Sequence, residues 1–230
     1  MDKDEVLKWL ERKGTRKYVE GMSRYGIQTD KRVFGVSVGT LRSFAKQLGK
    51  DHALAAELWK SGCYEGQMLA TLIDDRKLVT RSQMNAWAAD FDNWAICDTA
   101  CFHLFDRTPF AWQKAHQWST SRHEFVKRAA FAMMAGLTIH DKAAPDKQFL
   151  ELLPLIETGA HDDRNFVKKA VNWALRSIGK RSQALNTAAI ASAKGLAQSE
   201  EAVCRWVGKD ALRELSSQKV KSRLARRPTE

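Results

Sequence analysis

Hydrophobic positions recur along this chain with a period near 3.6 residues, which is typical of amphipathic helices. No run of β-branched residues alternates with polar residues in the manner of a strand. The pattern therefore predicts an all-α protein. The predicted helices cover residues 5–13, 15–25, 37–48, 52–59, 64–73, 82–89, 93–105, 109–118, 123–139, 146–157, 163–178, 182–197, 200–215 and 217–224.

Several positions between these helices carry ending or linking signals. Residues 26–35 contain two glycines and are expected to form a linker. Thr15 is an expected N-cap and Gly179 an expected C-cap. Residues 226–230 are expected to fray, as chain ends often do.

One segment of the pattern recurs almost unchanged. Phe125-Val126-Lys127-Arg128-Ala129-Ala130 returns as Phe166-Val167-Lys168-Lys169-Ala170-Val171, displaced by 41 residues. That displacement falls in the period of about 40–47 residues that paired-helix HEAT-type repeats show. The recurrence predicts a HEAT-like (ARM-type) helical-repeat solenoid whose second helices line a concave face. A generic helical bundle with two similar amphipathic helices is the alternative.

The repeat also predicts how the chain is organised. We expect a single solenoid domain over residues 1–230. Its N-terminal helices lie in 1–25, its repeat core in 26–180, and its C-terminal helices and basic tail in 181–230.

Charge narrows the possible partners. The 230 residues include 38 Lys and Arg against 27 Asp and Glu, a formal net charge of +11. Such an excess favours an acidic partner, with nucleic acid first and an anionic membrane surface second. A basic protein without such a partner is the alternative. The longest nearly apolar run, 129–139, is shorter than the ~18–20 residues that span a bilayer. No signal-like apolar block follows the charged start, so a cytoplasmic protein is expected.

The spacing of cysteines and histidines gives no sign of a metal site or a redox-active cysteine pair. The four cysteines form no C-x-x-C pair, and the six histidines show no H-x-x-x-H spacing. Cys97 and Cys101 are four residues apart in a helical pattern and are expected to fill the core. We therefore expect no metal and no cofactor.

Two groups of residues carry the candidate chemistry. Trp94 and Asp98 are four apart, so they share a helix face, and Asp98 stands in an apolar stretch where a carboxylate is costly to bury without a partner. A structural cap or ion pair is an equally open interpretation. In the second group, Lys169, Trp173 and Arg176 follow i, i+4, i+7 beside Lys168.

Interleaved basic and aromatic side chains suit a phosphate backbone beside a sugar or base. Arg128 holds the position equivalent to Lys169 one repeat earlier, so the two are expected to be neighbours on the concave face. A solvated basic face with a core tryptophan is the alternative.

From about Tyr25 to Lys180, the chain resembles the HEAT-like alkylpurine DNA glycosylases of the AlkD type. The resemblance rests on three motifs. They are Trp94-Ala95-Ile96-Cys97-Asp98, Phe125-Val126-Lys127-Arg128-Ala129-Ala130, and Phe166-Val167-Lys168-Lys169-Ala170-Val171-Asn172-Trp173-Ala174-Leu175-Arg176. It implies that Asp98 is catalytic, that Trp94 and Trp173 contact the deoxyribose, and that Arg128 and Arg176 contact DNA.

The same resemblance implies a reaction and a partner. The expected activity is hydrolysis of the N-glycosidic bond of positively charged N3- and N7-alkylpurines in double-stranded DNA, as in base excision repair. The expected form is a monomer without a membrane partner. A non-catalytic DNA-binding HEAT-repeat protein is the main alternative, and a HEAT or armadillo protein that binds acidic peptides is a third.

Overall fold

The computed structural model describes residues 1–226 and is helical throughout, apart from one isolated parallel bridge between Arg32 and Cys63. Of the described residues, none lies in a helix long and apolar enough to cross a membrane. The chain forms two compact units, an N-terminal unit of residues 1–108 and a C-terminal unit of residues 109–230. The prediction of a single domain over 1–230, with a concave face, stays a prediction, as does the fraying of 226–230, most of which lies outside the described residues.

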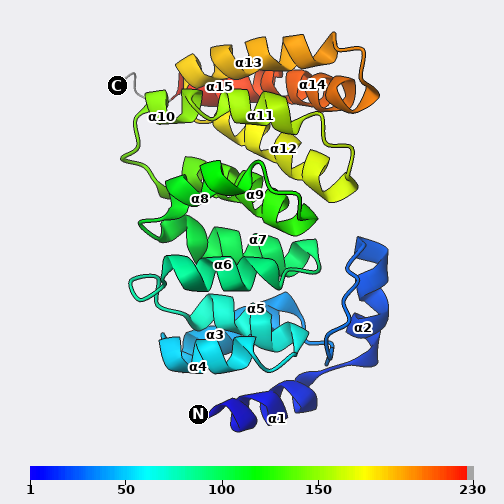
Figure 1. The fold of residues 1–230 in the computed structure, drawn as a ribbon, viewed down its shortest axis with the longest axis vertical. Coiled ribbons are helices and arrows are strands. Elements are labelled where there is room, and N and C mark those ends of the chain that lie inside the picture. Colours follow the sequence, from blue (N-terminus) through cyan, green and yellow to red (C-terminus); the bar gives the residue numbers. More distant parts are fainter. Residues whose placement is uncertain (227–230) are drawn as a thin grey trace. The chain divides into compact units, whose positions relative to one another are not determined.

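The N-terminal unit is a set of short helices (Figure 1). Helix α5 packs against α3, α4 and α7, so α3, α5 and α7 form successive layers. The elements are α1 (Lys3–Lys13), α2 (Arg16–Met22), the 3-10 turn η1 (Ser23–Tyr25), α3 (Val38–Leu48), α4 (His52–Trp59), α5 (Tyr64–Ile73), α6 (Arg81–Ala89), α7 (Trp94–His103) and the 3-10 turn η2 (Phe105–Arg107).

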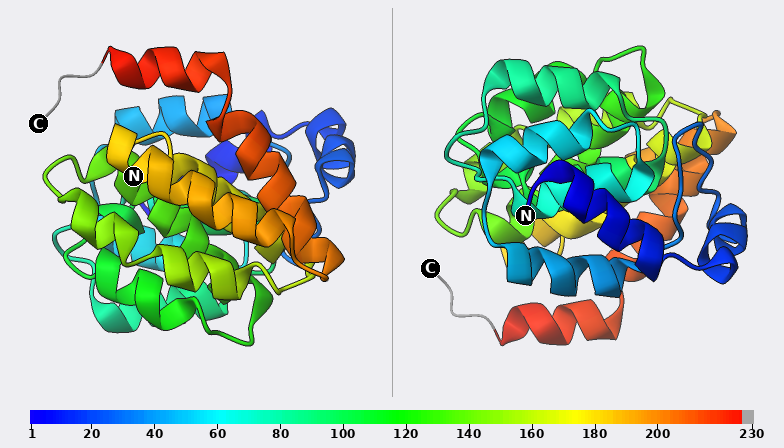
Figure 2. Two further views of the ribbon diagram at one scale, coloured as in Figure 1. Left: turned by 90° about the horizontal axis from the view of Figure 1, so that it is seen from above. Right: turned by 90° about the horizontal axis from the view of Figure 1, so that it is seen from below.

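The C-terminal unit repeats this arrangement, and its helices α9, α12, α13 and α14 are longer than those of the N-terminal unit. Helix α12 packs against α9 on one side and α14 on the other, and α13 lies beside α14 (Figure 2). The elements are α8 (Ala111–Trp118), α9 (Glu124–His140), α10 (Asp146–Leu150), α11 (Leu153–Gly159), α12 (Asn165–Ile178), α13 (Gln183–Ala197), α14 (Ala202–Leu215) and α15 (Gln218–Ala225).

The predicted repeat is visible in the packing of α9 and α12. The rings of Phe125 and Phe166, which hold equivalent positions 41 residues apart, lie with their centroids 5.4 Å from each other. Equivalent residues of consecutive repeats contact each other when repeat units stack. The all-α, HEAT-like fold is therefore confirmed, and the generic bundle is not.

Helix starts follow local capping chemistry. The side chains of Ser37, Asp51, Thr80 and Ser182 each accept a hydrogen bond from a backbone N–H in the first turn of the helix that follows. Thr15 holds the N-cap position of α2, but its side chain makes no such bond. Instead, the Thr15 hydroxyl donates to the carbonyl oxygen of Gly35 at 3.5 Å, so the side chain expected to cap the helix contacts the 26–35 linker.

Three predicted helices differ from the structure. The range 15–25 divides into α2 and η1, and the range 93–105 divides into α7 and η2. The range 146–157 divides into α10 and α11, because Pro154 in the first turn of α11 lacks the N–H that a continuous helix would need. The other predicted ranges agree with the structure to within two residues at each end.

Buried side chains fill each unit separately. In the N-terminal unit the rings of Trp59 and Trp87 stack 4.0 Å apart. In the C-terminal unit Gly179 caps α12 as predicted, at an ordinary φ of −65°. A Cβ atom there would lie within 3.0 Å of the side chains of Leu215 and Ala189, so glycine serves close helix packing at this position. The four cysteines, all within the described residues, are buried and form no disulfide bond, and Cys97 and Cys101 lie in the core as expected.

Candidate functional site

Trp94 and Asp98 lie on the first turns of α7. Asn93 starts this helix, because its side-chain oxygen accepts hydrogen bonds from the backbone N–H groups of Ala95 and Ile96, at 3.0 and 3.1 Å. Both Trp94 and Asp98 are partly exposed, whereas the face that carries Ala95 and Ile96 is buried. The Asn93 cap therefore sets the start of α7 at Trp94, and with it the positions of Trp94 and Asp98 on one helix face.

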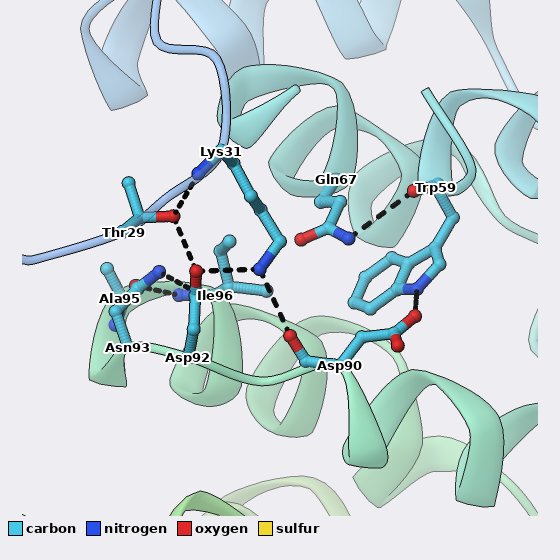
Figure 3. Close-up of polar contacts among 9 residues, drawn as sticks. All are labelled: Thr29, Lys31, Trp59, Gln67, Asp90, Asp92, Asn93, Ala95 and Ile96. Carbon is cyan, nitrogen blue, oxygen red and sulfur yellow. Dashed lines mark hydrogen bonds and ion pairs between the residues drawn. The ribbon is translucent and has the colours of Figure 1, made fainter. Parts of the chain in front are cut away.

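A polar network holds the segment before α7 in place (Figure 3). The ammonium of Lys31 lies 2.7 Å from a carboxylate oxygen of Asp92 and donates to the carbonyl of Asp90 at 3.1 Å. Thr29 donates to the same carboxylate at 2.5 Å, and the indole of Trp59 donates to Asp90 at 2.8 Å. The linker after η1 is thereby tied to the residues that start α7.

The charge of Asp92 depends on this network. Burial alone would raise the pKa of Asp92, but the hydrogen bonds from Lys31 and Thr29 hold that pKa below its usual range. The carboxylate therefore stays ionised and keeps its partners Lys31, Thr29 and Asn93 at neutral pH.

Trp94 also holds a backbone segment far away in the sequence. Its indole N–H donates to the carbonyl oxygen of Tyr25 at 2.9 Å. Tyr25 ends η1, and Gly26 follows it in the left-handed region with φ 67°. Tyr25 is 73% exposed. The structure thus brings an exposed aromatic residue to Trp94, and sequence reasoning missed it because Tyr25 reads as the end of a helix.

Asp98 lies at the margin of an apolar core. Burial raises the pKa of the Cys101 thiol well above its usual value, and the nearby charges of Cys97, Asp98 and Asp106 add to that rise. Asp98 itself is partly exposed. A carboxylate in such a position can stabilise a developing positive charge.

The other five predicted site residues lie in the C-terminal unit. Arg128 differs most from expectation. Only 6% of it is exposed, and its guanidinium donates to the carbonyl oxygen of Phe166 at 2.6 Å. Lys169, at the equivalent position of the next repeat, is exposed. The expectation of two neighbouring cations on one surface is wrong for Arg128, because the stacking of α9 on α12 buries its side chain.

Arg176 also binds protein groups, the carboxylates of α14. It forms an ion pair with Glu214, which Lys180 contacts at 2.7 Å, and lies 3.9 Å from Asp210. Burial alone would raise the pKa of Glu214, but hydrogen bonds from Lys180 and Arg176 lower it. Arg176 therefore links α12 to α14, and a phosphate would have to join or displace this pairing.

Lys168 and Trp173 complete the predicted set. Trp173 is partly buried on α12. The ammonium of Lys168 lies 5.6 Å from the ring centre of Trp206, which is 43% exposed on α14. Trp206 was not predicted, although Trp206, Lys209 and Arg213 at i, i+3, i+7 combine aromatic and basic residues on one helix face, as Lys169, Trp173 and Arg176 do at i, i+4, i+7. This combination was the signal that could have found it.

A second ionic cluster lies where α9 and α12 begin. Asp162 lies 2.9 Å from Lys127 and 2.6 Å from Arg164. Burial alone would raise the pKa of Asp162, but the hydrogen bonds from these two cations lower it to about 2. Lys127 is the repeat equivalent of Lys168, so the same position serves an internal ion pair in one repeat and a surface contact in the next.

The comparisons with known proteins concern the family and the fold. The model of the family described as "DNA alkylation repair enzyme" matches residues 6–215, and the chain belongs to that family. No curated protein sequence matches significantly.

Two solved structures give a comparison of folds. One is described as a new family of proteins related to the HEAT-like repeat DNA glycosylases with affinity for branched DNA structures; it is 21% identical, with a TM-score of 0.77 over 97% of this chain and 96% of that one. An engineered protein is 14% identical, with a TM-score of 0.40 over 90% of this chain and 98% of that one.

Proposed function

We propose that this protein is a DNA glycosylase that hydrolyses the N-glycosidic bond of N3- and N7-alkylpurines in duplex DNA. The observation that carries the proposal is the Trp94–Asp98 face at the capped start of α7, partly exposed and adjoined by Tyr25. Membership of the DNA alkylation repair enzyme family supports it.

The chemistry suits a single carboxylate. An N3- or N7-alkylated purine carries a positive charge, so it leaves as a neutral base without being protonated. The usual pair of carboxylates in glycoside hydrolysis is therefore unnecessary. Asp98 stabilises the oxocarbenium-like sugar and orients a water molecule, whose oxygen bonds to C1′ as the base departs. The water's proton passes to Asp98 or solvent, and the step requires no metal or cofactor.

The aromatic and basic residues act in binding. The faces of Trp94 and Trp173 favour a cationic sugar or base. Lys168, Lys169 and Arg176 contact phosphates. Lys169 is exposed and can do so directly, whereas Arg176 must share or exchange its present protein partners. Arg128 is buried and supports this surface from within, through its hydrogen bond to the carbonyl of Phe166. We propose that the protein acts in this way as a monomer.

A second candidate function is binding of branched DNA without catalysis. The observation that favours it is the fold shared with a protein of a family that has affinity for branched DNA. The excess of positive charge suits either function, because both require contact with phosphates. The two proposals differ in what they require of Asp98.

A base-release assay separates them. Duplex DNA containing 7-methylguanine is incubated with wild-type protein, Asp98→Asn and Glu57→Gln, and free base is measured. We expect Asp98→Asn to lower the release rate on the order of 100-fold or more while binding the same duplex at least as well. Glu57 is an exposed carboxylate on α4, so Glu57→Gln makes the same change in charge without changing the rate.

The outcomes are distinct. Equal release by wild type and Asp98→Asn would overturn the role of Asp98. No release by wild type, together with tighter binding of a four-way junction than of a linear duplex, would replace the first proposal with the second.

A further inference from the structure

We propose that His161, Glu201 and Cys204 form a binding site for a divalent transition metal of the zinc class, separate from the proposed glycosylase chemistry. One donor atom from each residue lies within 4.8 Å of the other two. Imidazole nitrogen, carboxylate oxygen and thiolate sulfur are the ligand types that zinc takes in proteins. No other use for this combination follows from the proposed function.

Two neighbouring repeats supply the three residues. His161 follows the C-terminal end of α11, while Glu201 is the N-cap residue of α14 and Cys204 lies in its first turn. The carboxylate of Glu201 lies between the other two side chains. One oxygen is 2.8 Å from Nδ1 of His161, and the other is 4.0 Å from Sγ of Cys204.

These separations are close to those of a zinc site. Zinc bonds of about 2.0–2.3 Å at tetrahedral angles place ligand atoms roughly 3.3–3.7 Å apart. The nitrogen and oxygen must move slightly apart and the sulfur slightly closer. Rotations of the exposed His161 and Glu201 side chains supply most of that change, because about half of each is open to solvent.

The site has an entrance and a buried end. The side chains of His161 and Glu201 are 55% and 52% exposed, whereas Cys204 is buried beside the carbonyl oxygen of Ala160 at 3.4 Å. His161 also lines a cavity of ≈ 440 Å³ together with Glu157 and residues of α13. A metal can therefore approach from the imidazole side and leave room for a water ligand.

Metal binding at this site exchanges a proton for a cation. Cysteine binds a metal as the thiolate, so the Cys204 thiol gives up its proton when the metal binds. The thiol and M²⁺ give the metal thiolate and one proton, which passes to the buffer, and nothing is oxidised or reduced. The bound metal would join the turn after α11 to the start of α14.

The alternative is a simple His–carboxylate ion pair beside a core thiol. The chain offers a matched control for it. Nδ1 of His52 lies 2.6 Å from a carboxylate oxygen of Asp74, and this pair lies outside the metal-ligand group found among the described residues. If the pair geometry alone attracts metal, His52 will matter as much as His161.

The experiment uses the full chain, freed of metal by chelation, titrated with Co²⁺ and then challenged with Zn²⁺. We expect a thiolate-to-cobalt charge-transfer absorption that saturates at one Co²⁺ per chain and disappears when Zn²⁺ is added. Cys204→Ala should abolish this absorption. His161→Gln and Glu201→Gln should weaken Zn²⁺ affinity roughly tenfold or more, since even outer-shell changes cost about 10–100-fold. His52→Gln should change neither the charge-transfer absorption nor the Zn²⁺ affinity.

Two results would overturn the proposal. One is the absence of the charge-transfer absorption at saturating Co²⁺. The other is an equal absorption in wild type and in Cys204→Ala. If Cys204→Ala does not fold, the half-exposed His161 and Glu201 variants decide the question, with Zn²⁺-dependent Tm as a second readout. None of these readouts involves base release, so failure here leaves the proposed glycosylase function standing.

Discussion

The two units of the chain differ in charge more than in architecture. Residues 1–108 contain 17 Lys and Arg against 15 Asp and Glu, a net charge of +2. Residues 109–230 contain 21 against 12, a net charge of +9. The near-neutral N-terminal unit carries Asp98, and the basic C-terminal unit carries Lys168 and Lys169.

Under the proposed function, this difference assigns catalysis to the N-terminal unit and most of the affinity for DNA to the C-terminal unit. A catalytic carboxylate gains nothing from repelling phosphates, whereas affinity for DNA depends on cations that neutralise them. Several cations of the C-terminal unit nevertheless bind other groups of the protein. Arg128, Arg164 and Arg176 each contact protein groups, so formal charge overstates the positive surface available to DNA.

The largest effect that tests this comparison concerns Arg128. Arg128→Ala should lower the free energy of unfolding by about 1.5–3 kcal/mol, because the partly buried carbonyl of Phe166 loses a charged donor. Urea unfolding measures the change. Lys169→Ala, at the exposed repeat-equivalent position, should change stability by less than about 0.5 kcal/mol. If Arg128→Ala weakened DNA binding without changing stability, Arg128 would be a surface phosphate contact after all.

Acid should affect the C-terminal unit through Asp162. Its pKa of about 2 lies below the ordinary value of 3.8, so the stabilisation is complete above that ordinary value and is lost as pH falls toward 2. The side chain is 8% exposed, and we expect about 1–2 kcal/mol. Urea unfolding at pH 7 and pH 3 should show a smaller loss for Asp162→Asn than for wild type. An equal loss in both proteins would contradict this assignment.

A smaller effect tests the N-terminal unit. Trp94→Phe keeps an aromatic ring but removes the N–H that holds the carbonyl of Tyr25, which should cost about 1 kcal/mol. Hydrogen exchange should then become faster around η1. Trp206→Phe, at an exposed tryptophan of the C-terminal unit, should leave η1 unchanged. Unchanged exchange in Trp94→Phe would mean that the indole does not anchor Tyr25.

The smallest effect concerns a single exposed cation. Lys169→Ala should weaken binding of methylated and unmodified duplex equally and reduce the slope of log affinity against log salt by about one. Lys46→Ala, at an exposed lysine of α3 in the N-terminal unit, should leave that slope unchanged. Equal effects of the two variants would remove the proposed division between the units.

Much of the fold was predictable because it depends on local signals. The ranges 52–59 and 64–73 agree with α4 and α5 at both ends, since apolar spacing and capping residues act over a few positions. The break between α10 and α11 was missed, although Pro154 is a local signal as well. Trp206 was missed because its high exposure runs against the usual burial of tryptophan.

The amino-acid sequence by itself determined the helices, the 41-residue recurrence, and the shared face of Trp94 and Asp98, because each depends on spacing along one helix. Only the tertiary structure decided which cations face solvent and which distant groups meet. Arg128 and Lys169 occupy equivalent repeat positions, yet packing between α9 and α12 buries one and leaves the other exposed. His161 and Cys204 are separated by two entire helices, α12 and α13, so no spacing rule could bring their donor atoms together.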